Sequence, residues 1–165
     1  MRQFLKINSF ILLAFFLVPF ISLFYFDFTN EITRQLCLCI PSTVSALWIF
    51  AISYCLDKHK NSGRVITAIV SILLLLVILS SWITAYLPFD LEINASLPRS
   101  FHLLKIKSGL MFGVALLMAF KIKKVLFERS LWWIFVEIFT FPIGVITLTP
   151  EINSFLNEEE EKLKK

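Results

Sequence analysis

The chain has 165 residues, of which 58% are hydrophobic and 17% charged, and its formal net charge at pH 7 is +4. Soluble domains average about 45–50% apolar and about 25% charged residues. The charged residues of this chain also gather in clusters between long apolar stretches. These features exclude a soluble globular domain, a disordered chain and a disulfide-stapled miniprotein, and they predict a small integral membrane protein.

Three apolar stretches are long enough to cross a bilayer, which takes about 20 mostly apolar residues. Residues 7–26, 36–56 and 65–87 contain no Asp, Glu, Lys, Arg or His. Backbone amides inside lipid must be hydrogen-bonded within their own segment, so we expect three membrane-spanning helices. The first stretch follows Arg2 and Lys6, as in a signal peptide, but no small-residue cleavage site ends it, which favours a retained helix.

A fourth span is expected over residues 106–127, where the apolar part between Lys107 and Lys121 is short. Lysine side chains at such positions extend toward the membrane surface, which compensates for the missing length. We therefore expect Lys121, Lys123 and Lys124 at one surface of the membrane.

The next apolar stretch, residues 131–148, contains Glu137 and Pro142. Each of its large apolar side chains favours insertion by about 0.3–0.6 kcal/mol, and together they roughly balance the carboxyl group and the proline. The stretch is therefore a fifth span, a re-entrant or interfacial helix, or a helix buried against other subunits. We expect two regions: an all-α transmembrane four-helix bundle over residues 1–127 and a membrane-associated region over residues 128–165.

The distribution of lysine and arginine predicts the orientation, because these residues accumulate on the cytoplasmic side. With the N-terminus inside and four spans, twelve of the 16 basic residues lie inside and four outside. Five spans give nine inside and seven outside. We therefore expect four spans in a bacterial inner membrane, with both termini in the cytoplasm.

The largest external segment is the loop of residues 88–108. Apolar and polar residues alternate over residues 89–94, which predicts a short extended stretch, and an amphipathic interfacial turn, FHLLKIK, follows it. The loop is either an outward-facing contact surface or a connector, and the pattern favours a connector. Its candidate contact residues are Phe89, Asp90, Glu92 and Arg99.

The C-terminal tail predicts a charged amphipathic helix over residues 150–165. A capping hydroxyl, a proline and an acid stand in sequence at Thr149, Pro150 and Glu151, which is typical of a helix start. An apolar stripe and Glu–Lys pairs four residues apart follow. The tail either docks a soluble protein or is a solvated end. The candidate docking residues are Trp132, Trp133, Glu137, Ile152, Phe155 and Leu156.

Small residues four apart occur in the predicted fourth span, a spacing that allows helices in lipid to approach closely. They are Gly109, Gly113, Ala115 and Ala119. The spacing is compatible with packing inside one chain and with homo-oligomer formation.

The sequence has no nucleophile, phosphate-loop or metalloprotease motif, so we predict no enzyme and no catalytic, cofactor-binding or metal-binding residue. Cys37 and Cys39 have neither a redox nor a zinc-site spacing. Glu137 is the one carboxyl group in an apolar stretch. It is a protonatable or partner-paired site, or an interfacial acid, which the pattern favours. The positive charge suits anionic lipid better than nucleic acid.

The short basic turns DKHKNSGR and FKIKKVLFER, the chain length, the span count and the charge layout resemble small multi-pass proteins of bacterial conflict systems. These are colicin-type immunity proteins and the membrane subunit of the Kiwa anti-phage system. The resemblance to the Kiwa subunit implies a four-span oligomer that partners a cytosolic effector, and it assigns no functional residue.

We therefore expect a non-enzymatic membrane sensor or anchor that holds a cytosolic partner through its C-terminal region. The alternatives are an immunity protein that inhibits a pore-forming toxin, and a small passive channel or carrier.

Overall fold

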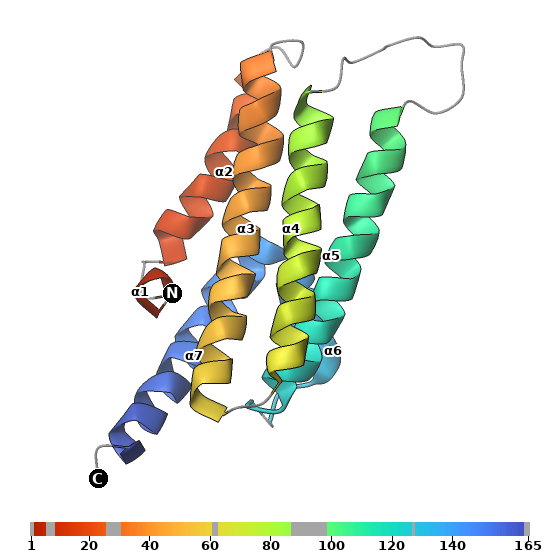
Figure 1. The fold of residues 1–165 in the computed structure, drawn as a ribbon. Helices are drawn as coiled ribbons and strands as arrows, with labels where there is room; N and C mark the ends of the chain where they lie inside the picture. The colour runs from red at the N-terminus through yellow and green to blue at the C-terminus, as the bar shows by residue number, and fades with distance from the viewer. Residues whose placement is uncertain are drawn as a thin grey trace.

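The computed structural model describes residues 2–5, 9–25, 31–60, 63–86, 99–126 and 128–163. Every regular element within these ranges is an α-helix, which confirms the all-α fold class. The helices, in chain order, are α1 (Arg2–Leu5), α2 (Ser9–Tyr25), α3 (Glu31–Lys60), α4 (Arg64–Tyr86), α5 (Arg99–Lys123), α6 (Leu131–Phe139) and α7 (Phe141–Leu163) (Figure 1).

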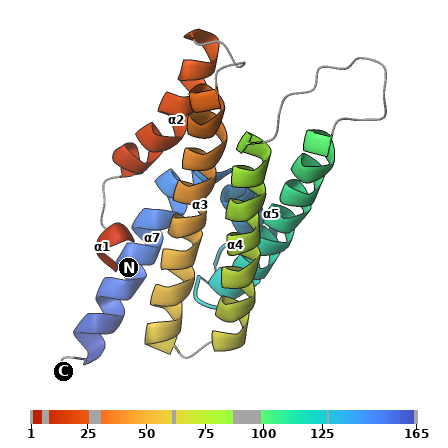
Figure 2. The ribbon, with the colours of Figure 1, turned by 45° about the horizontal axis from the view of Figure 1, so that its top comes forward.

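Helix α3 is the centre of the bundle and packs against α1, α2, α4, α5 and α7. Helices α3, α4 and α5 lie side by side, with α4 running opposite to its two neighbours (Figures 1 and 2). The turn from α3 to α4 requires a glycine, because Gly63 has a φ of 135°. The carbonyl of Gly63 accepts the Thr67 N–H at 3.0 Å and so begins α4. We call this end of the bundle, together with residues 124–126 and 128–130, the basal end.

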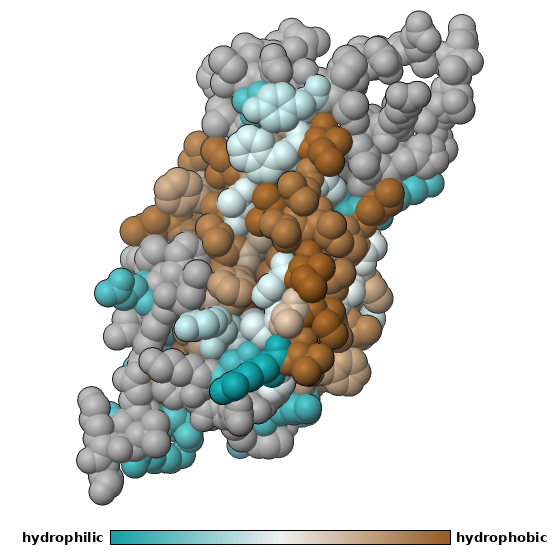
Figure 3. All heavy atoms as spheres, viewed as in Figure 1, coloured by the Kyte–Doolittle hydropathy of each residue, from teal (hydrophilic) through white to brown (hydrophobic). Residues whose placement is uncertain are grey.

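The core lies between α3 and the helices around it. Trp48, Ile49 and Ile52 of α3 are fully buried, as are Val70 of α4 and Val114 of α5. Apolar side chains also cover the outside of the bundle, which a water-exposed surface of this size rarely shows. Hydrophobic spheres dominate the middle of the face in Figure 3, and hydrophilic ones gather below them. The exposed apolar residues of α4 are Val65, Ile69, Ile72, Leu75, Leu76, Leu79, Trp82, Ile83 and Tyr86.

Within the described residues, two helical stretches are long and apolar enough to cross a membrane: Cys39–Asp57 and Arg64–Tyr86. They coincide with the second and third expected spans. Helices α2 and α5 occupy the positions of the first and fourth expected spans, but their described parts do not meet the same measure of length and composition. Helix α5 begins at Arg99 rather than near residue 106, so the segment expected as an interfacial turn is helical.

The stretch of residues 131–148 is not one helix. Helix α6 ends at Phe139, and Thr140 turns the chain by bonding the Val136 carbonyl twice, through its N–H at 2.8 Å and its hydroxyl at 2.6 Å. Pro142 then falls in the first turn of α7, where the missing N–H costs little. Helix α6 starts at the basal end, and α7 returns to that end (Figures 1 and 2). Residues 131–148 thus form the first helix and the start of the second helix of a hairpin.

The expected helix start at Pro150 is wrong. Helix α7 is continuous from Phe141 to Leu163, and Pro150 lies inside it. A proline in a helix interior costs about 3 kcal/mol. The buried side chains of Leu148, Ile152 and Leu156 offset that cost, because α7 fixes all three against the bundle only if it is unbroken.

The predicted extended stretch over residues 89–94 lies outside the described residues. The same holds for three of the four candidate contact residues, Phe89, Asp90 and Glu92. Arg99, the fourth, is the first residue of α5.

Candidate functional site

The basal end holds a buried lysine at the junction of α3, α4 and α5. Lys121 Nζ lies 2.7 Å from Asp57 Oδ1 and donates to the Ser53 carbonyl at 2.8 Å. It also bonds the hydroxyl of Ser53 at 2.9 Å and that of Thr67, which in turn donates to Asp57. We call these four residues the Lys121 cluster. Each N–H of the Lys121 ammonium group therefore has an acceptor within reach, as a buried charge requires.

The Lys121 side chain does not extend outward as expected, because it is fully buried in the bundle. It lies seven residues after Val114 and three after Met118, both of which are buried on the same face of α5. Asp57, near the end of α3, supplies the opposite charge. Helix periodicity was the signal that could have placed Lys121 inside.

A second ion cluster joins the chain before α6 to both arms of the α6–α7 hairpin. Arg129 Nη1 lies 2.6 Å from each carboxylate oxygen of Glu137 in α6, and its other terminal nitrogen pairs with Glu151 in α7. We call these three residues the Arg129 cluster. The hydrogen bond to Glu137, helped by that to Glu151, raises the pKa of Arg129. The guanidinium therefore stays charged at every physiological pH.

The structure places Glu137 differently from the favoured interpretation of an interfacial acid. Its carboxylate is fully buried while Arg129 is a quarter exposed. Glu137 is therefore the partner-paired acid of the two alternatives, and it is not accessible for docking a protein. No local sequence pattern predicts the pair of Arg129 and Glu137, because the two residues lie in different elements, eight positions apart.

A cleft of roughly 520 Å³ opens beside the Arg129 cluster. It is lined by two apolar residues, Val125 and Leu126, and by three charged ones, Glu128, Arg129 and Glu151. The cleft therefore lies at the basal end.

The hairpin is fixed to the middle of the bundle through Trp48. The indole N–H of Trp48 donates to the Thr149 hydroxyl at 2.9 Å, and its ring meets Phe141 edge-on at 5.3 Å between centroids. A Cβ on Gly144 would collide with the Glu137 carbonyl and lie 3.0 Å from Trp48 Cη2. The absence of a side chain at Gly144 thus allows α7 to cross close to both α6 and α3.

The apolar stripe of the tail packs against the chain itself. Ile152 and Leu156 are buried in the core, and the Asn153 amide donates to the Leu5 carbonyl of α1 at 2.9 Å. The prediction that Ile152 and Leu156 form a docking surface is therefore wrong, since the bundle already covers them. Phe155 is half-buried against the same core.

The charged part of the tail begins after Asn157. Glu158, Glu161 and Lys162 are exposed there. Lys162 pairs with Glu159 at 3.0 Å, a contact that raises the pKa of Lys162. The described side chains beyond Leu156 are thus mostly exposed and charged.

Trp132 and Trp133 remain available on the surface at the start of α6, with exposed fractions of 67% and 55%. The Trp132 ring stacks on Phe135 at 5.2 Å between centroids, so its orientation is fixed. These two are the docking candidates that the structure leaves accessible.

The small residues of α5 separate into two groups. Ala115 and Ala119 are fully buried and pack inside the chain. Gly109 and Gly113 face outward, and a Cβ at either would meet no described atom within 4 Å. The glycines therefore serve no close packing within the described part of the bundle.

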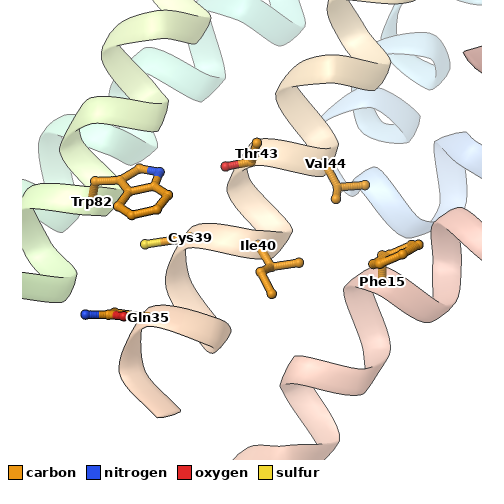
Figure 4. A pocket seen from close by; sticks show the side chains of 7 residues that line it. All are labelled: Phe15, Gln35, Cys39, Ile40, Thr43, Val44 and Trp82. Carbon is orange, nitrogen blue, oxygen red and sulfur yellow. The ribbon is translucent and has the colours of Figure 1, made fainter. Parts of the chain in front are cut away.

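An apolar cavity of roughly 450 Å³ crosses the surface of α3 between α2 and α4. Figure 4 shows Trp82 of α4 on one side and Phe15 of α2 on the other. Five side chains of α3 form the rest of the lining: Gln35, Cys39, Ile40, Thr43 and Val44.

The described residues bring together no group of three His, Cys, Asp or Glu side chains that could hold a metal ion. The ionisable groups of the two clusters are held in ion pairs. No protein-family model, curated protein or solved structure matches the chain.

Proposed function

We propose that the protein is a non-enzymatic membrane subunit with four spans, formed by α2 to α5 with their flanking residues. The observation that carries this proposal is the apolar outer surface of the bundle, with the charged clusters at its basal end. Helix α4 supports it most directly, because its exposed side is almost continuously apolar along 23 residues. Such a face is stable against lipid and is an aggregation hazard in water.

The basal end is proposed to face the cytoplasm. Arg64 and Lys124 are exposed there, which agrees with the positive-inside rule. The α6–α7 hairpin returns to this end, so the tail lies on the same side as the α3–α4 turn. A reporter fused to Lys165 tests the orientation: we expect a fluorescent protein to be active and alkaline phosphatase to be inactive. Active phosphatase would contradict the proposed topology.

The tail is proposed to hold a cytosolic protein. Its support is the solvated, charged helix after Asn157, next to the exposed Trp132 and Trp133. A truncation at Pro150 would remove Ile152 and Leu156 from the core and would damage the fold, so the informative truncation ends at Asn157. We expect the full-length protein in mild detergent to co-purify a partner that this truncation loses.

A second variant keeps the tail helix and changes only its charge. Glu158→Gln with Glu161→Gln alters two exposed residues beyond the last buried positions of the apolar stripe, Ile152 and Leu156. If charge mediates the docking, this variant should also lose the partner. Identical partners in all three preparations would contradict the docking role.

Following the resemblance to the Kiwa subunit, we propose a role as an oligomeric sensor or anchor in anti-phage defence. A plaque assay on cells that express the chain with its neighbouring genes tests this role. We expect plating efficiency to fall, and to recover when the tail is removed after Asn157. Equal plaque counts with and without the genes would contradict it.

An immunity protein is the second candidate, and one observation favours it. The outward face of α5 combines Gly109 and Gly113 with exposed Ile106, Phe112 and Leu116, a surface suited to packing against another helix in lipid. That helix belongs to a second copy in the first proposal and to a toxin in this one. Survival of expressing cells against one pore-forming toxin would select the second candidate.

A further inference from the structure

We propose that the cavity between α2, α3 and α4 binds one acyl chain of a membrane lipid, with the polar part of the lipid at Gln35. This inference rests on the proposed membrane location. It adds a defined lipid site to a surface that the proposed function treats as uniform.

The shape of the cavity suits a long, thin ligand. Its lining on α3 starts at Gln35 and ends at Val44, nine residues later, a distance of about 13 Å along the helix axis. Phe15 and Trp82 stand on opposite sides of this path, as Figure 4 shows. Both rings are about half-exposed, so the site is open to the surrounding medium beside each of them.

The polarity of the lining changes along the same path. Gln35 lies near the start of α3, at the end of the bundle opposite the basal end (Figure 1). Trp82 stacks on Tyr86 at 6.2 Å between centroids at this end, and such rings favour the membrane–water interface. Ile40 and Val44 lie deeper. A lipid has the same order, with polar groups at the interface and a hydrocarbon chain below.

The polar atoms among the deeper residues do not require a polar ligand. Cys39 Sγ lies 3.9 Å from the Ser81 carbonyl, so its thiol is directed at α4. Thr43 has a single hydroxyl, which a helical residue can satisfy on its own preceding turn. The remaining surface is hydrocarbon and aromatic ring, the usual lining of sites for apolar ligands.

The size of the cavity suits a single hydrocarbon chain. The cavity has a volume of roughly 450 Å³ along a path of about 13 Å. An extended chain follows this path from Gln35 to Val44, with Phe15 and Trp82 beside it.

Native mass spectrometry of the full-length protein, released from detergent, tests the site. We expect the wild type to retain about one phospholipid per chain. Thr43→Phe places a ring in the cavity, so we expect at least a tenfold loss of the lipid-bound fraction. Leu75→Phe is the matched control: it adds a ring to an exposed position of α4 outside the cavity, and it should keep the lipid.

Three results would overturn the lipid site. The first is no bound lipid in the wild type, and the second is equal lipid in Thr43→Phe and Leu75→Phe. The third is efficient disulfide formation between copies that carry Thr43→Cys, because a second chain would then occupy the cavity. Extraction of membranes with alkaline carbonate separates this failure from that of the proposed function. A chain that resists extraction but binds no lipid refutes the site alone, whereas a chain released by carbonate refutes both.

Discussion

The indole nitrogen of Trp48 and the hydroxyl of Thr149, 101 residues apart in the chain, are joined by a buried hydrogen bond of 2.9 Å. Trp48 belongs to the central helix α3, and Thr149 to the helix that ends in the charged tail. The contact therefore connects the middle of the bundle to the part of the chain proposed to hold a partner. A change at Thr149 should alter the position of the tail without touching any residue of the tail surface.

Thr149→Val should destabilise the protein by about 1–3 kcal/mol, because it leaves the buried Trp48 N–H without an acceptor. Valine has nearly the same shape as threonine, so the loss reports the hydrogen bond rather than packing. The measurement is thermal unfolding in detergent, followed by circular dichroism. Thr147→Val is the control. Its hydroxyl is bonded only to the Ile143 carbonyl of its own helix, and its removal should change stability by less than about 0.5 kcal/mol.

Trp48→Phe combined with Thr149→Val extends this test. The double variant has neither donor nor acceptor, so its loss should be smaller than the sum of the two single losses. Additive losses would show that the two groups do not interact in solution, contrary to the structure.

Hydropathy predicts the helices of the bundle well and its buried charges poorly. The spans expected over residues 36–56 and 65–87 coincide with apolar parts of α3 and α4, because a long uncharged stretch has few structural alternatives. The sequence left three interpretations open for residues 131–148, and the structure shows that the chain reverses at Thr140. The reversal depends on Gly144 fitting beneath Trp48, a contact between distant segments that no local pattern contains.

The ion pairs also depend on contacts between different elements, which no local pattern contains. Lys121 and Glu137 are each at helix positions with buried neighbours, so periodicity can indicate that they point inward. Their partners, Asp57 and Arg129, come from other elements and become visible only in the fold. Pro150 was misleading for a related reason, because tertiary burial on both sides of it outweighs its own preference for a helix start.

Arg129→Met should cost about 3–5 kcal/mol, because it leaves the Glu137 carboxylate buried without a counter-charge. Arg129→Met with Glu137→Met should recover most of that loss, since two apolar side chains of similar size need no counter-charge. Glu151→Gln should cost less than about 1 kcal/mol, because Glu151 is 40% exposed. Thermal unfolding of the three variants measures whether their losses of stability follow this order. A double variant as unstable as Arg129→Met would contradict the prediction.

The Arg129 cluster should also contribute little to the pH dependence of stability between pH 7 and pH 9. A raised pKa means that the charge of Arg129 stabilises the fold fully below its ordinary pKa and that this contribution is lost only as pH rises through the higher folded value. Both values lie far above physiological pH. We therefore expect the difference in unfolding temperature between the wild type and Arg129→Met with Glu137→Met to be the same at pH 7 and at pH 9. A marked difference between these pH values would contradict the assigned pairing.

Lys121→Met tests the other cluster. It removes the charge that faces Asp57, so we expect a loss of about 3–5 kcal/mol, and Lys121→Met with Asp57→Leu should recover a substantial part of it. Lys124→Met is the matched control, because Lys124 is exposed at the same end of α5 and should change stability by less than about 0.5 kcal/mol. If the two single lysine variants unfold at the same temperature, Lys121 is not buried as described.

Two glycines should respond in opposite directions to the same substitution. Gly144→Ala places a Cβ against the Glu137 backbone and should cost about 1–3 kcal/mol or more, because a backbone has to shift. Gly113→Ala places a Cβ in open space, and it should stabilise the single chain by about 0.5–1 kcal/mol, since alanine favours the helix. Thermal unfolding in detergent measures both changes.

Self-association then distinguishes packing within the chain from packing between copies. If Gly113 lies at a contact between two chains, Gly113→Leu should weaken the oligomer while leaving the single chain folded, because only a neighbouring helix would meet the new side chain. Size-exclusion chromatography with light scattering measures the mass of the complex. The control is Leu75→Phe, which enlarges an exposed side chain on α4 away from the glycine face. An unchanged mass for Gly113→Leu would show that copies associate through another surface or not at all.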